Sequence, residues 1–334
     1  MSDVTALQLA KWSGIVASQL IKDSVITDDM TYVRDLNDAE DSVVAVVSTN
    51  VAKEVAKDSD RSAVTSVADS DRRLTHNKSI EAGDTVHYRE DQTKIPYNLI
   101  EEKMPLLGQQ AAVAHARRFF AYGVGTTSNF GGLVTTGPNH IITGDFTTAN
   151  SALNTLILNS LLNTRTLLVN QGVFVNPDDV FVAFAPSIWA RLHTIPEVKG
   201  HEYHWRESMG GVNRTKVFEY LDMSLMETPA GLGEDMTSTE FVDATHTPTK
   251  FKIDLSSYVA FAWVRTGYAQ GFAEGGKGDA KTGMPKRHAV TRVNDHWEKR
   301  RWVIDISMIY DVLYIYDNSD TNESLLGVAW KSTV

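Results

Sequence analysis

The stretch GFAEGGKG, residues 271–278, comes within one residue of a phosphate-binding loop. In such a loop a lysine follows the second glycine, and the next residue is a serine or threonine whose hydroxyl binds magnesium. Lys277 fits this pattern, but Gly278 stands where the hydroxyl is needed. The loop also needs a helix that begins at the lysine, because the free N–H groups of that helix bind the phosphate. Gly283 and Pro285 would interrupt such a helix. The sequence therefore predicts a glycine-rich turn between two strands, with Lys277 as a surface charge.

Other reactive patterns also lack the spacing that chemistry requires. His201 and His204 lie three residues apart, whereas a zinc-protease helix needs histidines four apart and a third ligand. Asp305, in the stretch WVIDIS, resembles a magnesium-binding strand only in its four apolar neighbours. No serine has the glycine-flanked pattern of a nucleophile elbow, and the chain contains no cysteine. We therefore predict no enzyme, no catalytic residue, no metal site and no cofactor.

Charge weighs against a protein that coats nucleic acid. The basic run 285–302 contains Lys286, Arg287, Arg292, Lys299, Arg300 and Arg301. Locally it resembles a nucleic-acid patch. The whole chain, however, has 42 acidic and 32 basic side chains and a formal net charge of -10. We favour a contact with protein, for which the acidic segment around residues 28–41 is one candidate.

Composition indicates a folded protein with more than one lobe. The chain has 334 residues, of which 42% are hydrophobic, and single cores stop growing at about 250–300 residues. The absence of cysteine fits a chain kept in a reducing cytoplasm. Charged residues interrupt the N-terminal apolar positions, so a signal peptide is not expected, and no stretch is long enough to span a membrane.

The N-terminal half is expected to begin with peripheral segments and to contain two long helices. Apolar spacing predicts an amphipathic helix in residues 7–21, and the acidic stretch 26–42 is expected to be an extended arm rather than core. Residues 43–90 are expected to form a long β-hairpin-like excursion with Gly83 in a turn. A long helix should follow Pro96, with glycines at 123 and 125 past its end, and a second helix should end at Gly172.

The C-terminal half reads as short elements followed by long strands. Residues 180–185 predict a buried strand, and Pro186 begins a short helix. A single strand is expected to end at Pro229. Alternating aromatic and β-branched residues predict long strands in 252–272 and 299–317. The sum is an α+β chain.

In this order the elements resemble the major capsid protein of tailed bacteriophages, which has the HK-ninety-seven-type fold. The resemblance covers about Gln92 to Asp317. It is carried by the return strand and long helix in QTKIPYNLIEEKMPLLGQQAAVAHARRFFAYGVGT, by the strand and short helix in DDVFVAFAPSIWARLH, by the proline-terminated strand in GVNRTKVFEYLDMSLMETP, and by the closing strands SSYVAFAWVRTGYAQGF and RRWVIDISMIYDVLYIYD.

The resemblance implies a division of the chain into five parts. They are an N-terminal arm (1–42), an extended β-hairpin called the E-loop (43–93), a peripheral domain (94–172) with a spine helix at about 101–122, an axial domain (173–255), and closing strands that return to the peripheral domain (256–334). It further implies contacts between subunits at Leu7, Trp12, Val16 and Leu20 of the arm and at Arg72, Arg73, Lys78 and Arg89 of the E-loop.

The implied function is self-assembly into an icosahedral shell that encloses double-stranded DNA. The partners would be copies of the chain in hexamers and pentamers, a portal, a possible decoration protein and weakly contacted DNA. About forty residues precede the E-loop, so a separate scaffolding protein is expected. The protein would reside in the virion after assembly in the host cytoplasm. Two alternatives stay open: a bacterial nanocompartment shell protein of the same fold, and a P-loop nucleotide hydrolase.

Overall fold

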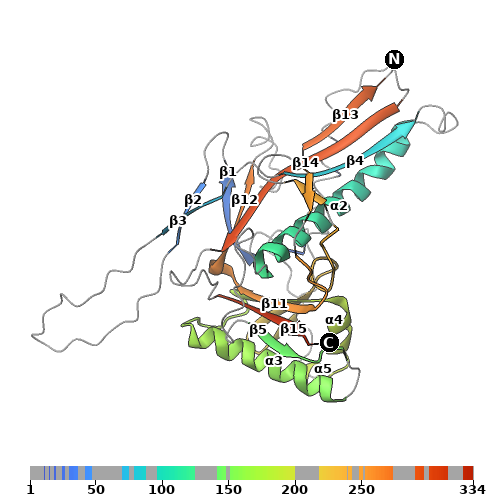
Figure 1. The fold of residues 1–334 in the computed structure, drawn as a ribbon. Helices are drawn as coiled ribbons and strands as arrows, with labels where there is room; N and C mark the ends of the chain where they lie inside the picture. The colour runs from blue at the N-terminus through green and yellow to red at the C-terminus, as the bar shows by residue number, and fades with distance from the viewer. Residues whose placement is uncertain are drawn as a thin grey trace, which may run out of the picture.

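The computed structural model shows an α+β protein built on two principal sheets (Figure 1). It describes residues 11, 15, 19, 25–26, 30–36, 42–46, 70–74, 79–87, 96–124, 141–147, 151–199, 218–238, 240–242, 248–250, 253–273, 290–296, 301–314 and 326–333. No helix in this described part is long and apolar enough to cross a membrane.

A six-stranded sheet lies between two layers of helix. Its strands, in spatial order, are β5 (Ile141–Gly144), β15 (Gly327–Ser332), β11 (Tyr258–Val264), β6 (Val180–Phe184), β8 (Met223–Glu227) and β7 (Phe218–Tyr220). Helix α2 (Pro96–Val124) lies on one side of this sheet, and α3 (Ser151–Asn170) and α4 (Pro186–Leu192) lie on the other (Figure 1). The two layers enclose two separate apolar cores.

Strand β11 shows how one sheet serves both cores. Successive side chains of a strand point to opposite faces, and every residue of β11 is buried. Phe261 and Trp263 pack in the core on the α2 side, whereas Ala262 and Val264 pack in the core on the α3 side. A strand that is covered on both faces has a continuous run of apolar residues in its sequence. The alternation of apolar and polar residues that marks a half-buried strand is therefore absent from β11.

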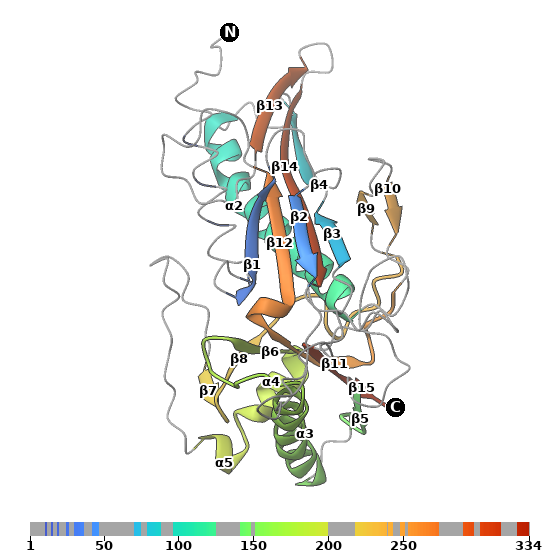
Figure 2. The same cartoon turned by 90° about the vertical axis from the view of Figure 1, so that its left-hand side faces the viewer.

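A second sheet extends away from the lobe that contains α3 (Figure 1). Its path is β1 (Tyr32–Leu36), β12 (Tyr268–Ala273), β14 (Arg301–Tyr314) and β13 (Val290–His296), and β4 (Ser79–His87) also pairs with β14. Figure 2 shows β1, β12 and β14 side by side. The sheet and the first part of α2 run outward together, since α2 packs on β4 and β14. Two small sheets pair β2 (Ser42–Val46) with β3 (Ser70–Leu74) and β9 (Glu240–Val242) with β10 (Pro248–Lys250).

Helix α3 is the second helix that the sequence predicts, and it is buried along one face. Leu153, Ile157, Leu161 and Leu168 are all buried. The helix ends as expected at Gly172, which has a φ of +81°. There the Val173 N–H donates to the Leu168 carbonyl and the Gly172 N–H donates to the Val169 carbonyl, which is the glycine-terminated Schellman arrangement. The predicted strand β6 and the proline-initiated helix α4 are also confirmed. The short helix α5 (Pro196–Lys199) follows them.

The long helix predicted after Pro96 is α2, but the expected position of Gly123 is wrong. Gly123 lies inside the helix, which continues to Val124. A Cβ on Gly123 would lie 2.8 Å from a ring carbon of Phe261. This glycine therefore permits close packing of α2 on β11 and does not end the helix. Residue 125 lies outside the described residues.

Two single strands predicted in the C-terminal half are each divided. The strand expected to end at Pro229 is a hairpin of β7 and β8, joined by Leu221 and Asp222 at φ of 53° and 61°. Non-glycine residues seldom adopt such angles, so the sequence carries no signal for this turn. The strand expected over 252–272 is broken by the 3-10 helix Arg265–Gly267 (η3) into β11 and β12, which lie in different sheets.

Two expectations for the N-terminal region are also wrong. Gly83 lies within β4, opposite Asp305 of β14, and not in a turn. The segment expected to be an arm outside the core contributes to it, because Ile26 is fully buried and Met30 is 2% exposed. The strand β1 that follows pairs in parallel with β12. The acidic composition of 26–42 concealed these few apolar contacts.

Candidate functional site

The motifs that suggested chemistry are not assembled in the described part of the chain. Gly271, the first glycine of the phosphate-loop pattern, lies in β12 between Arg34 and Asp311 on the neighbouring strands. A residue inside a paired strand does not form a loop around a phosphate. Residues 274–278 of that pattern, including Lys277, and both histidines of the HEYHW stretch lie outside the described residues. Within the described residues no group of three metal-binding side chains is found.

Most of the predicted subunit-contact residues lie outside the described part of the chain. They are Leu7, Trp12, Val16, Leu20, Lys78 and Arg89. Arg72 and Arg73 belong to β3, opposite Val44 and Val43 of β2, and are described by their backbone alone. The hairpin pairing of β2 with β3 agrees with the predicted β-hairpin-like excursion. Contact between subunits at these residues stays a prediction.

The described geometry is richest where α2 meets the segments that precede β1 and form β12 and β14. His115 of α2 lies 2.9 Å from Gln270 of β12, measured from Nε2 to Oε1. The Gln270 amide donates to the Thr31 hydroxyl at 2.6 Å. All three side chains are buried, and the His115 ring packs on that of Tyr310 of β14 with centroids 4.4 Å apart. This chain of polar contacts ties four segments that are distant in the sequence.

Aromatic rings fill the space beside this polar chain. Phe119 of α2 packs edge-on against Trp263 of β11 with ring centroids 5.2 Å apart, and Phe261 stacks on Trp263 at 5.7 Å. The Trp263 indole donates to the Met30 carbonyl at 3.0 Å. The N-terminal segment, by which we mean the described residues from 25 to 36, is thereby held to the core by a buried hydrogen bond as well as by its apolar side chains.

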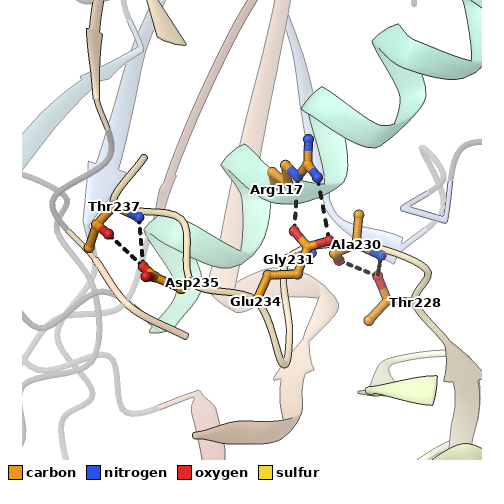
Figure 3. Close-up of polar contacts among 7 residues, drawn as sticks. All are labelled: Arg117, Thr228, Ala230, Gly231, Glu234, Asp235 and Thr237. Carbon is orange, nitrogen blue, oxygen red and sulfur yellow. Dashed lines mark hydrogen bonds and ion pairs between the residues drawn. The ribbon is translucent and has the colours of Figure 1, made fainter. Parts of the chain in front are cut away.

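A second junction joins α2 to the loop that follows β8 (Figure 3). Arg117 Nε donates to Glu234 Oε2 at 2.9 Å, and its Nη2 donates to Glu234 Oε1 at 3.4 Å. Glu234 Oε2 also accepts the Gly231 N–H at 3.2 Å. Gly231 has a φ of +93°, and a Cβ there would lie 2.8 Å from the ring of Phe120. The glycine is therefore required both by its backbone angle and by its closeness to α2.

The electrostatics at this junction are local and structural. Hydrogen bonds from the side chain and backbone of Thr237 lower the pKa of the Asp235 carboxyl, which these contacts hold in its ionised form (Figure 3). Burial raises the pKa of the Tyr258 hydroxyl in β11. Both hydrogen bonds to Asp235 come from Thr237, two residues further along the same loop. The arrangement can hold α2, the N-terminal segment and the β8 loop in one rigid unit.

Sequence reasoning missed the residues that make these junctions. His115, Gln270 and Glu234 come from segments up to 155 residues apart, and none belongs to a recognisable motif. The available signal was a polar residue amid apolar neighbours: His115 lies in AAVAHA, and Gln270 follows an apolar run. Such a residue predicts a buried hydrogen bond but does not identify its partner.

Comparison with known proteins gives similarity in structure alone. No protein-family model and no curated protein sequence matches the chain. The mature capsid of bacteriophage PhiM1 matches with a TM-score of 0.54 and 11% identity, covering 91% of this chain and 86% of that chain. The capsid of cyanophage P-SCSP1u gives 0.55 and 9%, covering 93% and 89%. A virus-like particle from Pyrococcus furiosus gives 0.50 and 8%, covering 96% and 98%.

These matches span almost the whole of each protein. They therefore include the outward sheet with α2 as well as the lobe that contains α3. Identities near 10% make the shared feature the arrangement of elements and not the residues. The chain has the α+β, HK-ninety-seven-type fold that is found in bacteriophage capsids.

Proposed function

We propose that this chain is the major capsid protein of a tailed bacteriophage, which assembles into an icosahedral shell around double-stranded DNA. The observation that carries the proposal is the match to the phage capsids of PhiM1 and P-SCSP1u over more than 85% of each chain. The role is structural, and no enzymatic step belongs to it. A fold hosts many functions in general, so the proposal also needs support from this chain's own features.

The shape of the chain supports a shell subunit. The outward sheet and the first part of α2 extend from the lobe that contains α3 (Figure 1). An extension of this kind adds surface for contacts with neighbours. The buried junction at His115 and the half-buried junction at Arg117 give the extension a rigid base. A subunit that must meet its neighbours at defined angles needs such rigidity, because a shell closes only if each contact has a fixed geometry.

The partners follow from the same proposal. Copies of the chain would form hexamers and pentamers, assembled in the host cytoplasm and ending in the virion. A formal net charge of -10 suits a wall that contacts packaged DNA only weakly, because a basic wall would retain the DNA. A separate scaffolding protein, a portal and a decoration protein stay predictions. Co-purification of the chain with the products of neighbouring genes tests all three.

A nanocompartment shell is the second candidate, and the match to the Pyrococcus furiosus virus-like particle favours keeping it. The two kinds of shell have the same fold and differ in what they enclose. Particles isolated from the native source should contain double-stranded DNA that resists nuclease until the shell is opened. A protein cargo in place of DNA would favour the nanocompartment.

The direct test of assembly is negative-stain microscopy of the purified chain and of one internal deletion. Val46 of β2 lies opposite Ser70 of β3, so a two-residue Asn-Gly turn can replace residues 47–69 and still join the paired strands. We expect uniform closed shells from the full chain, and monomers or small oligomers from the deletion variant. Lys277→Ala is the control and should form normal shells. Neither this variant nor the full chain should hydrolyse nucleotide, because the P-loop alternative is not expected to hold.

The outcomes separate the hypotheses. A deletion variant that keeps the thermal unfolding of the full chain but forms no shells supports a contact role for the excised segment. Normal shells from the deletion variant would remove that role and leave the shell function in place. A full chain that forms no shell, even when it is produced with its neighbouring genes, would overturn the proposed function.

A further inference from the structure

The outer side of α3 is unusual for a helix that faces solvent. Only one of its 20 residues, Arg165, is charged. That guanidinium is engaged within the chain, since its Nη2 donates to Asp222 Oδ2 at 3.1 Å. The solvent side of a surface helix normally carries charged residues. The exposed side of α3 therefore differs from an ordinary hydrated surface.

Six exposed residues of α3 form a regular stripe, and the exposed Asn163 and Asn170 lie beside it. The stripe consists of Ala152, Thr155, Asn159, Leu162, Thr166 and Val169. Their spacing alternates between three and four residues, which keeps them on one line of the helix and is the spacing of a seam against which another element packs. Leu162 is 48% exposed and Val169 is 46% exposed. The stripe is uncharged along its whole length.

Phe174 continues this surface beyond the end of the helix. Its exposed fraction is 94%, whereas Val173 and Val175 on either side pack against the core. The hydrogen-bonded turn at Gly172 holds this short stretch in place, so the ring is directed outward by the fold. Leu162, Val169 and Phe174 are three of the five large apolar side chains that are exposed among the described residues. We call the stripe together with Phe174 the α3 ridge.

We propose that the α3 ridge is a contact surface for a second copy of this chain, an inference that rests on the proposed shell function. The ridge has no charge with which to recognise a nucleic acid or a charged peptide. The central part of a protein interface is depleted of charged residues, as this surface is, and Phe174 supplies an aromatic ring of the kind that is common there. In Figure 1 α3 lies at the outer edge of its lobe, and its open side faces away from the six-stranded sheet, where a neighbour can reach it.

Area also favours a neighbour in a larger assembly over a partner in an isolated dimer. A helix of 20 residues is about 30 Å long and about 10 Å wide, so its outer side offers about 300 Å². A stable pairwise interface buries about 800 Å² on each partner. The α3 ridge alone is too small for a stable dimer, but it suits one contact among several. In a ring or shell this contact would be heterologous, with the ridge meeting a different surface of the next copy.

The test is sedimentation velocity on the full chain over a range of concentrations. In the test variant Leu162→Asp and Phe174→Asp place charge on the ridge. In the matched control Leu162→Met and Phe174→Tyr keep the ridge uncharged and similar in size. We expect the test variant to need at least a ten-fold higher concentration for half-association and the control to behave like the wild-type chain. Both positions are exposed, so thermal unfolding of the unassembled chain should be unchanged in both variants.

A reporter identifies the surface that becomes covered. The chain has no cysteine, so Asn170→Cys supplies a single attachment point for an environment-sensitive dye on the exposed last turn of α3. The dye should report a shielded environment on association. A dye that stays in water within the assembly would overturn the proposal, and so would an aspartate variant that associates like the wild type or a wild-type chain that stays monomeric. Association into open arrays with a shielded dye would support the α3 ridge and overturn the closed shell instead.

Discussion

The two faces of the six-stranded sheet are closed in different ways, and two buried tryptophans show the difference. Trp263 and Trp330 are both fully buried, on adjacent strands and opposite faces. The Trp263 indole donates to the main-chain carbonyl of Met30, 233 residues away. The Trp330 indole donates to the Thr164 hydroxyl of α3, and its ring stacks on Phe146 at 5.7 Å. One face is thus sealed by an N-terminal segment, the other by a helix.

The difference extends to the two helices. From residue 115 to its end, α2 has buried residues all around, apart from the half-buried Arg117. Helix α3 is buried on one side and open to solvent on the other. A helix enclosed on all sides has its partners within the chain, whereas a helix with an uncharged open side can take one from outside. The α2 face is therefore packed within the chain from residue 115 onward, whereas α3 keeps an open side that a neighbour can reach.

The largest expected effect comes from removing either tryptophan. Trp263→Ala and Trp330→Ala should each lower the free energy of unfolding by about 3–5 kcal/mol, because each leaves a cavity in a packed core. The measurement is urea unfolding of the unassembled chain. Leu162→Ala on the exposed side of α3 is the control, and its effect should stay within about 0.5 kcal/mol.

Milder changes at the same two positions separate the faces. Trp263→Phe keeps most of the ring volume but removes the hydrogen bond to Met30. We expect faster amide hydrogen exchange in residues 30–36 for this variant and no change there for Trp330→Phe. Equal exchange in the two variants would contradict the idea that the α2 face is sealed by the N-terminal segment.

A smaller effect should follow from breaking the polar chain on the α2 face. Gln270→Leu leaves the buried His115 and Thr31 without their shared partner, which should cost about 1–3 kcal/mol in urea unfolding. Gln110→Leu makes the same substitution at an exposed position of α2 and should be nearly neutral. Combining Gln270→Leu with Thr31→Val should cost less than the sum of the two single changes, because they break the same hydrogen bond. Additive costs would show that the bond contributes nothing.

Features with a local cause could be predicted from the sequence, and features with a distant cause could not. The end of α3 is specified by Gly172, and the start of α4 by Pro186, because each residue favours its own backbone angle. The break at Arg265–Gly267 is different: a Cβ on Gly267 would lie 2.6 Å from the Cβ of Leu326, a residue about sixty positions away. No local pattern contains that contact.

The features of the candidate site can likewise be separated into those with a local cause and those with a distant cause. The β-branched runs predict a β-hairpin-like excursion and one of them contains β2, but β3 lies in a polar stretch with no strand signal. The pairing of β4 with β14 also has no local signal, which explains the wrong prediction of a turn at Gly83. In the junctions, Glu234 could be recognised only as an acidic residue in a loop. Its link to Arg117 depends on α2 and the β8 loop meeting in three dimensions. The architecture was therefore easier to infer than any contact within it.

The smallest expected effect compares one ion pair from each side of the sheet. Arg117 and Glu234, on the α2 side, are 33% and 31% exposed, whereas Arg165 and Asp222, on the α3 side, are 41% and 60% exposed. Arg117→Gln should cost about 1 kcal/mol and Arg165→Gln less than about 0.5 kcal/mol, because solvent weakens the more exposed pair. Thermal unfolding at low and high salt measures both, and salt should reduce the cost at Arg165 in greater proportion. Equal costs with equal salt dependence would contradict the distinction between an internal α2 face and an open α3 face.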